Sequence, residues 1–365
     1  MNFADEPMLA RLRNPSDSAL KASSTPRLRP KINRTPDLPA IDWTVVARSA
    51  PRLLRTPSEI PLADAVVITW TDAEWAALEH VFCGGARGMS YGARTSGYRT
   101  GWQRYTKNIP TIEGCAYWGE FRCVQINTAP VVLFKSNTRL DYPGERYLEQ
   151  LLRQLLASAK PKLVLSTGTA GGARPTDHLG TVNVTNAATL SVSGQPLSRW
   201  WPTYKNSWQP NWTLASSGGF AKLLLPVPTT QSDLTAVCAQ FNACYKSTYV
   251  LNQLDVDLDV ATGAPAINNL TAASIPLLST DSFVVGNQSG NLKSFACVEM
   301  DDAIIAKVCS AADVSFGFIR NISDPVQNAA LPPDVQAHWA QAIYDAYGFY
   351  TSFNSALTAW AVLAA

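Results

Sequence analysis

The feature that most constrains the fold is a repeated order of a short apolar run, a helical pattern and another apolar run. Residues 65–70 (AVVITW) form a continuous β-branched run, which is typical of a strand buried on both faces. Residues 72–82 (DAEWAALEHVF) follow with helical spacing. Further strands are expected at residues 122–127, 131–134, 162–167 and 316–324, and further helices at 147–160 and 334–360. This alternation predicts an α/β fold with helices on both faces of a largely buried sheet.

The chain divides into an arm and a domain by composition. Residues 1–61 hold nine of the 24 prolines and an excess of basic side chains, and residues 23–39 contain few large apolar side chains. Such a segment lacks the material for a core, so residues 1–61 are predicted to form an extended or disordered arm. Residues 62–365 form the predicted domain. Within it, residues 203–272 show no clear period and are interpreted as an insertion.

The charge balance and the scarcity of metal ligands exclude several function classes. Lys plus Arg is 30 and Asp plus Glu is 28, so no global field favours nucleic acid or a membrane surface as a partner. No apolar run reaches the roughly 20 residues of a membrane helix, and the acidic N-terminal sequence is unlike a signal peptide, so a cytoplasmic location is expected. The seven cysteines include no CxxC pair and the three histidines lie far apart. We therefore expect reduced cysteines, no metal and no organic cofactor.

Three polar clusters stand near the ends of predicted strands. Residues 166–184 (STGTAGGARPTDHLGTVNV) end a strand in a glycine-rich turn, where backbone amides can approach a ligand closely. Residues 279–287 (STDSFVVGN) and 295–309 (FACVEMDDAIIAKVC) precede the strand that ends at Asp324. Taken singly, these clusters have structural explanations, because Asp301 and Asp302 can complement a helix dipole and Asp324 can cap the next helix.

The order of these clusters resembles a known family. VITWTDAEW, STGTAGG, STDSF, VEMDDAIIAKVC and IRNISD follow one another as in the nucleoside phosphorylase and nucleosidase superfamily, most closely its methylthioadenosine/S-adenosylhomocysteine nucleosidase branch. The resemblance runs from about residue 64 to the end and is poorest in the insertion. It implies a three-layer α/β/α sandwich with a central mixed sheet, cleavage of the N-glycosidic bond between a purine base and ribose, and a homo-oligomer.

The resemblance also implies roles for individual residues. Asp324 matches the general acid that protonates the leaving base, which requires partial burial to keep its proton near neutral pH. Asp301 stands at the position of the family's ribose-binding glutamate, and it departs from that pattern by one methylene. Met300 is expected to pack under the sugar.

A second group of residues is predicted to contact the purine base and the rest of the substrate. Phe283 is expected to stack on the base, with core packing as the alternative, and the Val284 backbone to address the base's edge. Thr169, Ala170 and Gly171 of the glycine-rich turn are expected to contact the substrate.

The first turn bears on the nucleophile. Phosphorylases of the superfamily usually place a glycine and an arginine there to bind phosphate, whereas this chain has TWTDAEW and no arginine between Ala63 and Phe82. Glu74 matches the acidic residue that activates water in the hydrolases, and Asp72 is the nearby alternative. Water is the favoured nucleophile. A phosphate-dependent phosphorylase and a non-catalytic nucleotide sensor remain alternatives.

The substrate is predicted to be a small-molecule nucleoside or nucleotide. Several cations are candidates to face a 5′-phosphate, and the solvated surface is the alternative place for each. These cations are Arg94, Arg99, Arg104, Lys107, Lys135, Arg139 and Arg146. The Trp-rich residues 199–212 are interpreted as a lid or an interface patch.

Overall fold

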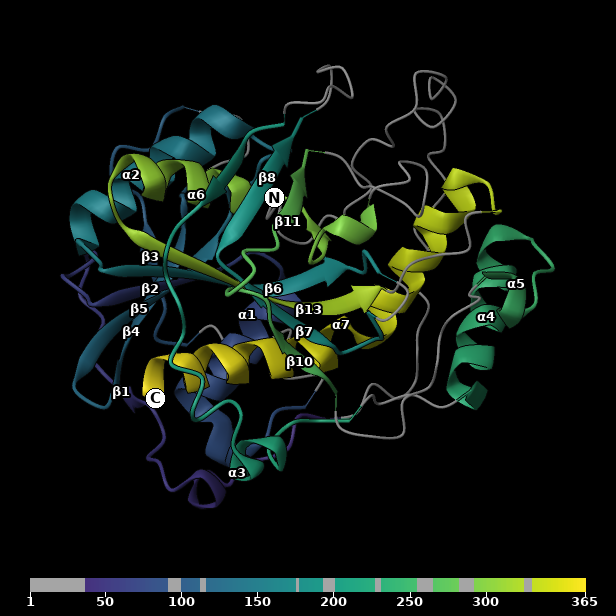
Figure 1. The fold of residues 1–365 in the computed structure, drawn as a ribbon, viewed down its shortest axis with the longest axis horizontal. Coiled ribbons are helices and arrows are strands. Elements are labelled where there is room, and N and C mark those ends of the chain that lie inside the picture. The colour runs from purple at the N-terminus through teal and green to yellow at the C-terminus, as the bar shows by residue number, and fades with distance from the viewer. Residues whose placement is uncertain are drawn as a thin grey trace.

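The fold was analysed in a computed structural model, which describes residues 37–90, 100–111, 116–174, 177–192, 201–226, 231–254, 265–281, 292–324 and 330–365 (Figure 1). The strands are β1 (Arg52–Leu53), β2 (Ala65–Thr69), β3 (Gln103–Tyr105), β4 (Gly119–Ile126), β5 (Ala129–Ser136), β6 (Leu163–Gly171), β7 (Val182–Thr185), β8 (Ala187–Ser191), β9 (Thr203–Lys205), β10 (Ile267–Asn269), β11 (Leu277–Thr280), β12 (Val298–Glu299) and β13 (Ser315–Asp324). The helices are α1 (Asp72–Glu79), α2 (Glu145–Ala159), α3 (Gly218–Ala221), α4 (Gln231–Tyr245), α5 (Leu251–Leu254), α6 (Asp302–Ala311) and α7 (Pro333–Ala364). The strands and helices predicted from the apolar runs are thereby confirmed.

Strand β6 occupies the centre of a mixed sheet. It pairs in parallel with β2 on one side and with β13 on the other, and β2 pairs in parallel with β5. Strand β4 joins β5 as an antiparallel hairpin and carries β1 and β3 on its other edge. Because the parallel strands run together, the carboxyl ends of β2, β6 and β13 lie at one edge of the sheet.

The sheet closes on itself beyond β6. Strand β13 pairs with β7, β8 pairs with β11, β11 pairs with β12, and β12 returns to β6 at Gly171. Strands β7 and β8 are separated by Asn186 alone, whose side-chain amide donates to the carbonyls of Asn206 and Trp208. The closed ring surrounds the end of β6 with strands, so polar side chains there are enclosed by protein.

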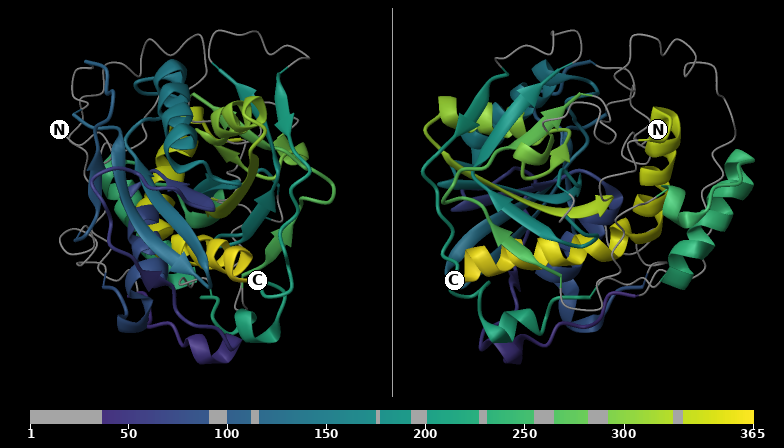
Figure 2. Two further views of the ribbon diagram at one scale, coloured as in Figure 1. Left: turned by 90° about the vertical axis from the view of Figure 1, so that its left-hand side faces the viewer. Right: turned by 45° about the vertical axis from the view of Figure 1, so that its right-hand side comes forward.

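Helices cover the two faces of the sheet. Helices α1 and α7 contribute their buried side chains to one apolar cluster, and α2 and α6 contribute theirs to a second cluster on the opposite face (Figures 1 and 2). Helix α2 is strongly amphipathic, because Leu148, Leu151, Leu152 and Leu155 lie along one buried stripe. The predicted α/β/α arrangement with a central mixed sheet is confirmed.

Residues 37–61 pack against the domain. Leu38, Ile41 and Trp43 are buried, and the Trp43 ring lies 4.5 Å from that of Trp360 between ring centroids. The segment therefore contributes to the core at least from residue 37 onwards, ahead of the boundary expected at residue 62. Residues 1–36 lie outside the described residues, so the arm stays a prediction for them.

The predicted insertion carries elements that pack on the core. In the Trp-rich run, the Trp208 ring lies so close to Gly317 of β13 that a Cβ there would come within 2.2 Å of it. Helix α4 packs on the N-terminal half of α7, where Phe241 meets Trp339 with ring centroids 5.6 Å apart. Trp208 thus fills space against the sheet, which is neither of the two roles expected for this run.

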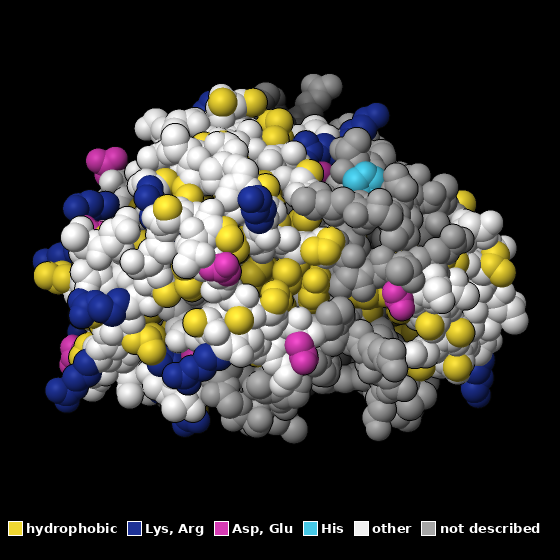
Figure 3. All heavy atoms as spheres, turned by 90° about the horizontal axis from the view of Figure 1, so that it is seen from below, with side chains coloured by type: hydrophobic (Ala, Val, Ile, Leu, Met, Phe, Trp, Pro, Cys, Tyr) yellow, Lys and Arg dark blue, Asp and Glu magenta, His cyan; other side chains and the backbone are white. Residues whose placement is uncertain are grey.

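The described surface carries charges of both signs. On the face shown in Figure 3, Lys and Arg side chains lie interspersed with Asp and Glu. No helix of the described residues is long and apolar enough to cross a membrane. Within the same residues, no group of three His, Cys, Asp or Glu side chains is arranged to hold a metal ion.

Candidate active site

Glu74 is held in place by the turn that joins β2 to α1. Thr71 caps α1, and the Glu74 carboxylate reaches back in a reciprocal capping box. Its Oε2 accepts hydrogen bonds from the Thr69 hydroxyl at 3.0 Å, from Trp70 N at 3.0 Å and from Thr71 N at 2.8 Å. Its Oε1 accepts from the backbone N of Thr169 at 2.8 Å and from its hydroxyl at 2.6 Å. The side chain thus links the first turn to the end of β6.

The charge of Glu74 is stabilised despite full burial. Burial raises its pKa, but Arg320 and the hydrogen bonds from Thr169 and Thr71 outweigh that effect, so its pKa lies below the usual value. The five donors fill the lone pairs of an ionised carboxylate. A further hydrogen-bond donor can therefore reach the Glu74 carboxylate only after one of these five leaves.

Arg320 is the centre of a buried ionic cluster. It stands in the middle of β13 and is 3% exposed. Its guanidinium forms a two-point contact with Asp302, with Nε donating at 2.8 Å, and it also donates to Glu299 Oε2 at 3.3 Å and to Ser166 at 2.7 Å. Both Arg320 and Glu74 crowd Gly168, where a Cβ would lie 2.9 Å from Nη1 and 2.6 Å from Oε1. One cation thus serves three buried carboxylates.

The excess of negative charge in this cluster favours the protonated form of Glu299. Burial raises the pKa of Glu299 to about 7, with Asp302 adding to the effect and Arg320 opposing it. Its oxygens accept hydrogen bonds from the backbone N of Asp301 at 2.7 Å and of Asp302 at 3.1 Å, and from the Ser279 hydroxyl. Glu299 therefore fixes the start of α6, where the residues predicted to bind the sugar stand.

Asp301 lies at the N-terminus of α6 and does not cap it. Its side chain instead accepts a hydrogen bond from Leu140 N, in the loop after β5, at 2.8 Å. Burial and the neighbouring Glu299 hold the pKa of Asp301 well above its usual value, against the opposing charge of Arg139. Met300 is 7% exposed beside it. A carboxyl group of this kind can accept a hydrogen bond from a sugar hydroxyl or, when protonated, donate one to it.

Asp324 ends β13 and has few hydrogen-bond partners in the part of the chain that the structure describes. Its Oδ1 accepts a hydrogen bond from the Ser323 hydroxyl at 2.7 Å, and its backbone carbonyl accepts from Gly172 N at 2.8 Å. A Cβ on Gly171 would lie 3.1 Å from its Oδ2, so the carboxyl group faces the end of β6. Burial raises the pKa of Asp324 to about 7, and the Ser323 hydrogen bond opposes that shift only in part. Asp324 does not cap α7, which begins nine positions later.

The predicted site residues gather around the end of β6. Thr169 bonds Glu74, Gly171 adjoins Asp324, and Ala170 accepts the Ser323 hydroxyl at 3.4 Å. Asp301 joins this group through Glu299 and Arg320. Phe283 and Val284 lie outside the described residues.

The sequence analysis missed the ionic cluster. It placed Asp302 at the helix dipole, whereas the side chain binds Arg320. It assigned no role to Arg320 or Glu299. A signal was available, because Arg320 is the one basic residue in the apolar run of residues 316–324, and a charge buried in a strand needs a partner.

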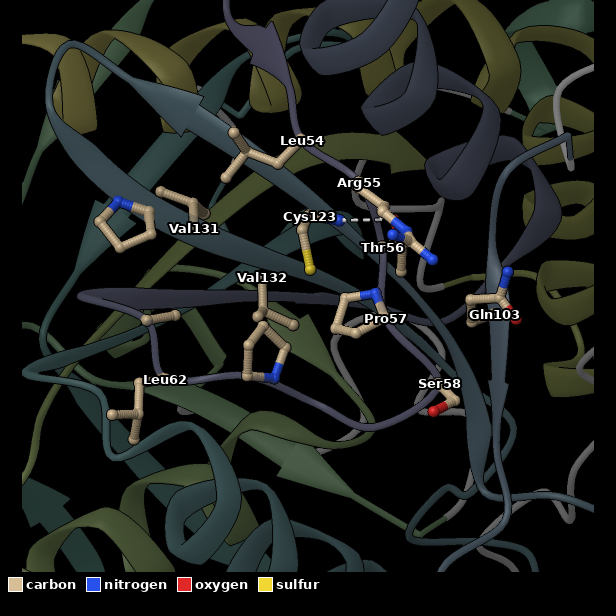
Figure 4. A pocket seen from close by; sticks show the side chains of 13 residues that line it. Leu54, Arg55, Thr56, Pro57, Ser58, Leu62, Gln103, Cys123, Val131 and Val132 are labelled. Atoms are coloured by element: carbon tan, nitrogen blue, oxygen red, sulfur yellow. Dashed lines mark hydrogen bonds between the residues drawn. The ribbon is translucent and has the colours of Figure 1, made fainter.

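A separate pocket of about 690 Å³ lies beside β4 and β5. It is lined by residues 54–58, 61–63 and 130–132 together with Gln103 and Cys123 (Figure 4). Cys123 N donates to the Thr56 hydroxyl at 3.2 Å, and burial raises the pKa of the Cys123 thiol to about 11. None of the predicted site residues lines this pocket, and its thiol is unreactive at neutral pH.

A family model for the phosphorylase superfamily matches residues 104–347. The chain belongs to the phosphorylase superfamily. This match covers β6, α6 and β13, the elements that carry Thr169, Asp301 and Asp324. A search of curated proteins finds no match.

Solved structures with a similar fold include nucleosidases. Futalosine hydrolase of Helicobacter pylori is 14% identical, with a TM-score of 0.44 over 82% of this chain and 97% of that one. The methylthioadenosine/S-adenosylhomocysteine nucleosidase of the same organism is 13% identical, with a TM-score of 0.44 over 82% and 97%. That of Neisseria meningitidis, in complex with methylthio-immucillin-A, is 14% identical, with a TM-score of 0.43 over 82% and 99%.

Proposed function

We propose that this member of the phosphorylase superfamily hydrolyses the N-glycosidic bond of a purine nucleoside or nucleotide, releasing the free base and ribose or ribose phosphate. The observation that carries the proposal is Asp324, a buried carboxyl group with a pKa of about 7 at the end of β13. Such a group can hold a proton at neutral pH and give it to the departing base. Asp301 and Met300 hold the ribose in this proposal, and Phe283 and Val284 address the base.

The electrostatics of the first turn support water as the nucleophile. A phosphate ion needs unpaired cations, but Arg320 is engaged by Asp302, Glu299 and Ser166. The surrounding carboxylates also repel an anion. Glu74 stays ionised, as a base must, and it accepts the proton of water once the Thr169 hydroxyl rotates away from Oε1.

The carboxylates of the site match the positive charge that develops on the sugar in the transition state. The sugar gains positive character as the bond to the base breaks, and carboxylates near the ring stabilise that charge. The acid and the base come from the two strand neighbours of β6, because Asp324 ends β13 and Glu74 lies on the helix that follows β2. No cofactor is needed for these steps. A homo-oligomer and a cytoplasmic location stay predictions.

A base-release assay tests the proposal. Purified protein is incubated with adenosine, inosine, methylthioadenosine, AMP and ATP, with and without inorganic phosphate, and released base is separated by chromatography. Free base and free ribose or ribose 5-phosphate without phosphate are the expected result. Base release that needs phosphate and yields ribose 1-phosphate identifies a phosphorylase. Tight binding of an unchanged nucleotide identifies a sensor.

A further inference from the structure

The loop after β5 lies against the predicted sugar carboxylate. Leu140 N donates to Asp301 Oδ1 at 2.8 Å, although the two residues are far apart in sequence. The loop has its own internal support, because Arg139 N donates to the Tyr142 carbonyl at 2.8 Å and Gly144 N to the Arg139 carbonyl at 3.2 Å. Residues 138–144 thus form a fixed wall beside Asp301.

This wall carries two buried oxygens without hydrogen-bond partners. Within the described part of the chain, Asp141 Oδ1 and Thr138 Oγ1 accept no hydrogen bond and donate none. Thr138 is fully buried. An unsatisfied buried polar atom costs about 1–3 kcal/mol, so a ligand that brings donors to this wall recovers that free energy.

The charges around the wall select the chemistry of such a ligand. Asp141 and Glu299 both act to raise the pKa of Asp301, and Arg139 opposes them. Burial likewise raises the pKa of Asp141, with Arg139 again opposing. Carboxyl groups thus outnumber the single guanidinium here, since Asp281 also raises the pKa of Asp141. This balance disfavours an anion and favours hydroxyl donors. Adjacent ring hydroxyls of a ribose meet this requirement.

We propose that Asp141 is a second sugar-binding carboxylate, and that Asp141 and Asp301 each accept a hydrogen bond from one of the two ring hydroxyls of ribose. The inference rests on the proposed function and deepens it, because it assigns the sugar-binding site to two loops. It also accounts for the short Asp301 side chain, since the loop after β5 supplies the second acceptor. The substrate class that follows is a ribonucleoside with both hydroxyls free.

Removal of single hydroxyls tests the pairing directly. The kcat/KM values for adenosine, 2′-deoxyadenosine and 3′-deoxyadenosine are measured with the wild type and with Asp141→Asn. In the wild type, loss of either hydroxyl is expected to lower kcat/KM by about 10- to 100-fold. In Asp141→Asn, kcat/KM for adenosine is expected to fall by a similar factor. Removing the hydroxyl that Asp141 binds should then lower kcat/KM of this variant by only about threefold or less.

Asp313→Asn is the matched control, because Asp313 is exposed and its φ of 53° is tolerated by asparagine. It is expected to change none of the three values. Equal losses for all three substrates in Asp141→Asn, or no loss at all, overturn the pairing. If the wild type releases no base from any substrate of the base-release panel, the proposed function fails, and calorimetric binding of the same three ligands then tests the pairing by the same ratios. Absence of binding overturns the sugar-binding site as well.

Discussion

Glu74 and Asp324 are two buried carboxyl groups on either side of the end of β6, and their environments differ sharply. Glu74 accepts five hydrogen bonds and lies near Arg320, and its pKa is lowered. Among the described residues, Asp324 accepts one side-chain hydrogen bond, and burial raises its pKa to about 7. Burial penalises the charge of both groups. The difference therefore comes from the charge of Arg320 and from the hydrogen-bond donors around Glu74.

This contrast suits one carboxyl group to act as a base and the other to act as an acid. A carboxylate that stays ionised can accept a proton, and one that is protonated near neutral pH can donate one. Both groups are buried, so the separation is maintained without a metal or cofactor in the proposed mechanism. Changes at the two environments should therefore affect stability to different extents.

Removal of Arg320 should have the largest effect on stability. Arg320→Leu leaves Glu74, Glu299 and Asp302 without their common cation. Loss of one partner of a buried ionic cluster costs about 3–5 kcal/mol. Urea denaturation at pH 7 measures this loss. A cost below about 1 kcal/mol contradicts the central role of Arg320.

The pH dependence of unfolding should separate Asp324 from Glu74. The folded-state pKa of Asp324, about 7, lies above its unfolded value, so between pH 4 and pH 7 the native state holds a proton that the unfolded state releases. Its contribution therefore falls as pH rises, by about 4 kcal/mol in total. The lowered pKa of Glu74 acts below pH 4.5, where stability falls as pH falls.

Asp324→Asn isolates this contribution. The free energy of unfolding of the variant, relative to the wild type, should increase between pH 5 and pH 8. Parallel stability curves for the two proteins across that range would show that the pKa of Asp324 is not raised.

Amide substitutions at the two carboxyl groups should have unequal effects on stability. Glu74→Gln replaces one carboxylate oxygen by an NH₂, which faces either the two Thr169 donors or the three donors of the first turn, so we expect a loss of about 1–3 kcal/mol. Asp324→Asn at pH 7 should cost about 1 kcal/mol or less, because its carboxyl group is already partly neutral there. Thermal unfolding of both variants measures the difference. Equal losses would remove the contrast.

Alanine substitutions at two glycines of β6 should give the smallest difference in stability between the surroundings of Glu74 and Asp324. A Cβ at Gly168 would lie 2.6 Å from the Glu74 carboxylate, whereas one at Gly171 would lie 3.1 Å from Asp324 Oδ2. Gly168→Ala should therefore cost about 1–3 kcal/mol by overpacking, and Gly171→Ala distinctly less. Calorimetry on the two variants checks the order, and the reverse order contradicts the packing around Glu74.

The sequence predicted the parts of the fold that follow from local patterns. The β-branched run at residues 65–69 became β2, and the leucine stripe became α2. Residues 37–61 were harder to predict, because their buried Leu38, Ile41 and Trp43 are scattered among prolines and charges. Their burial depends on α7 and α1, which are distant in sequence, and no local period reports such contacts.

The site likewise has parts that the sequence predicted and parts that it did not. Motif order singled out Glu74, Asp301 and Asp324, which the structure places around the end of β6, and their roles stay predictions. The partner of Arg320 was not predictable, because Asp302 at a helix start has a sufficient local explanation in the helix dipole. The contact of Asp301 with Leu140 depends on the loop after β5, which carries no motif.

The central claim is that Asp324 is the acid that protonates the leaving base. The most direct test is single-turnover base release by Asp324→Asn without phosphate, together with calorimetric binding of the same nucleoside and with Asp313→Asn as the control. We predict a loss of rate of about 100-fold or more, with binding within about threefold of the wild type. An unchanged rate, or a loss explained entirely by weaker binding, would contradict the claim.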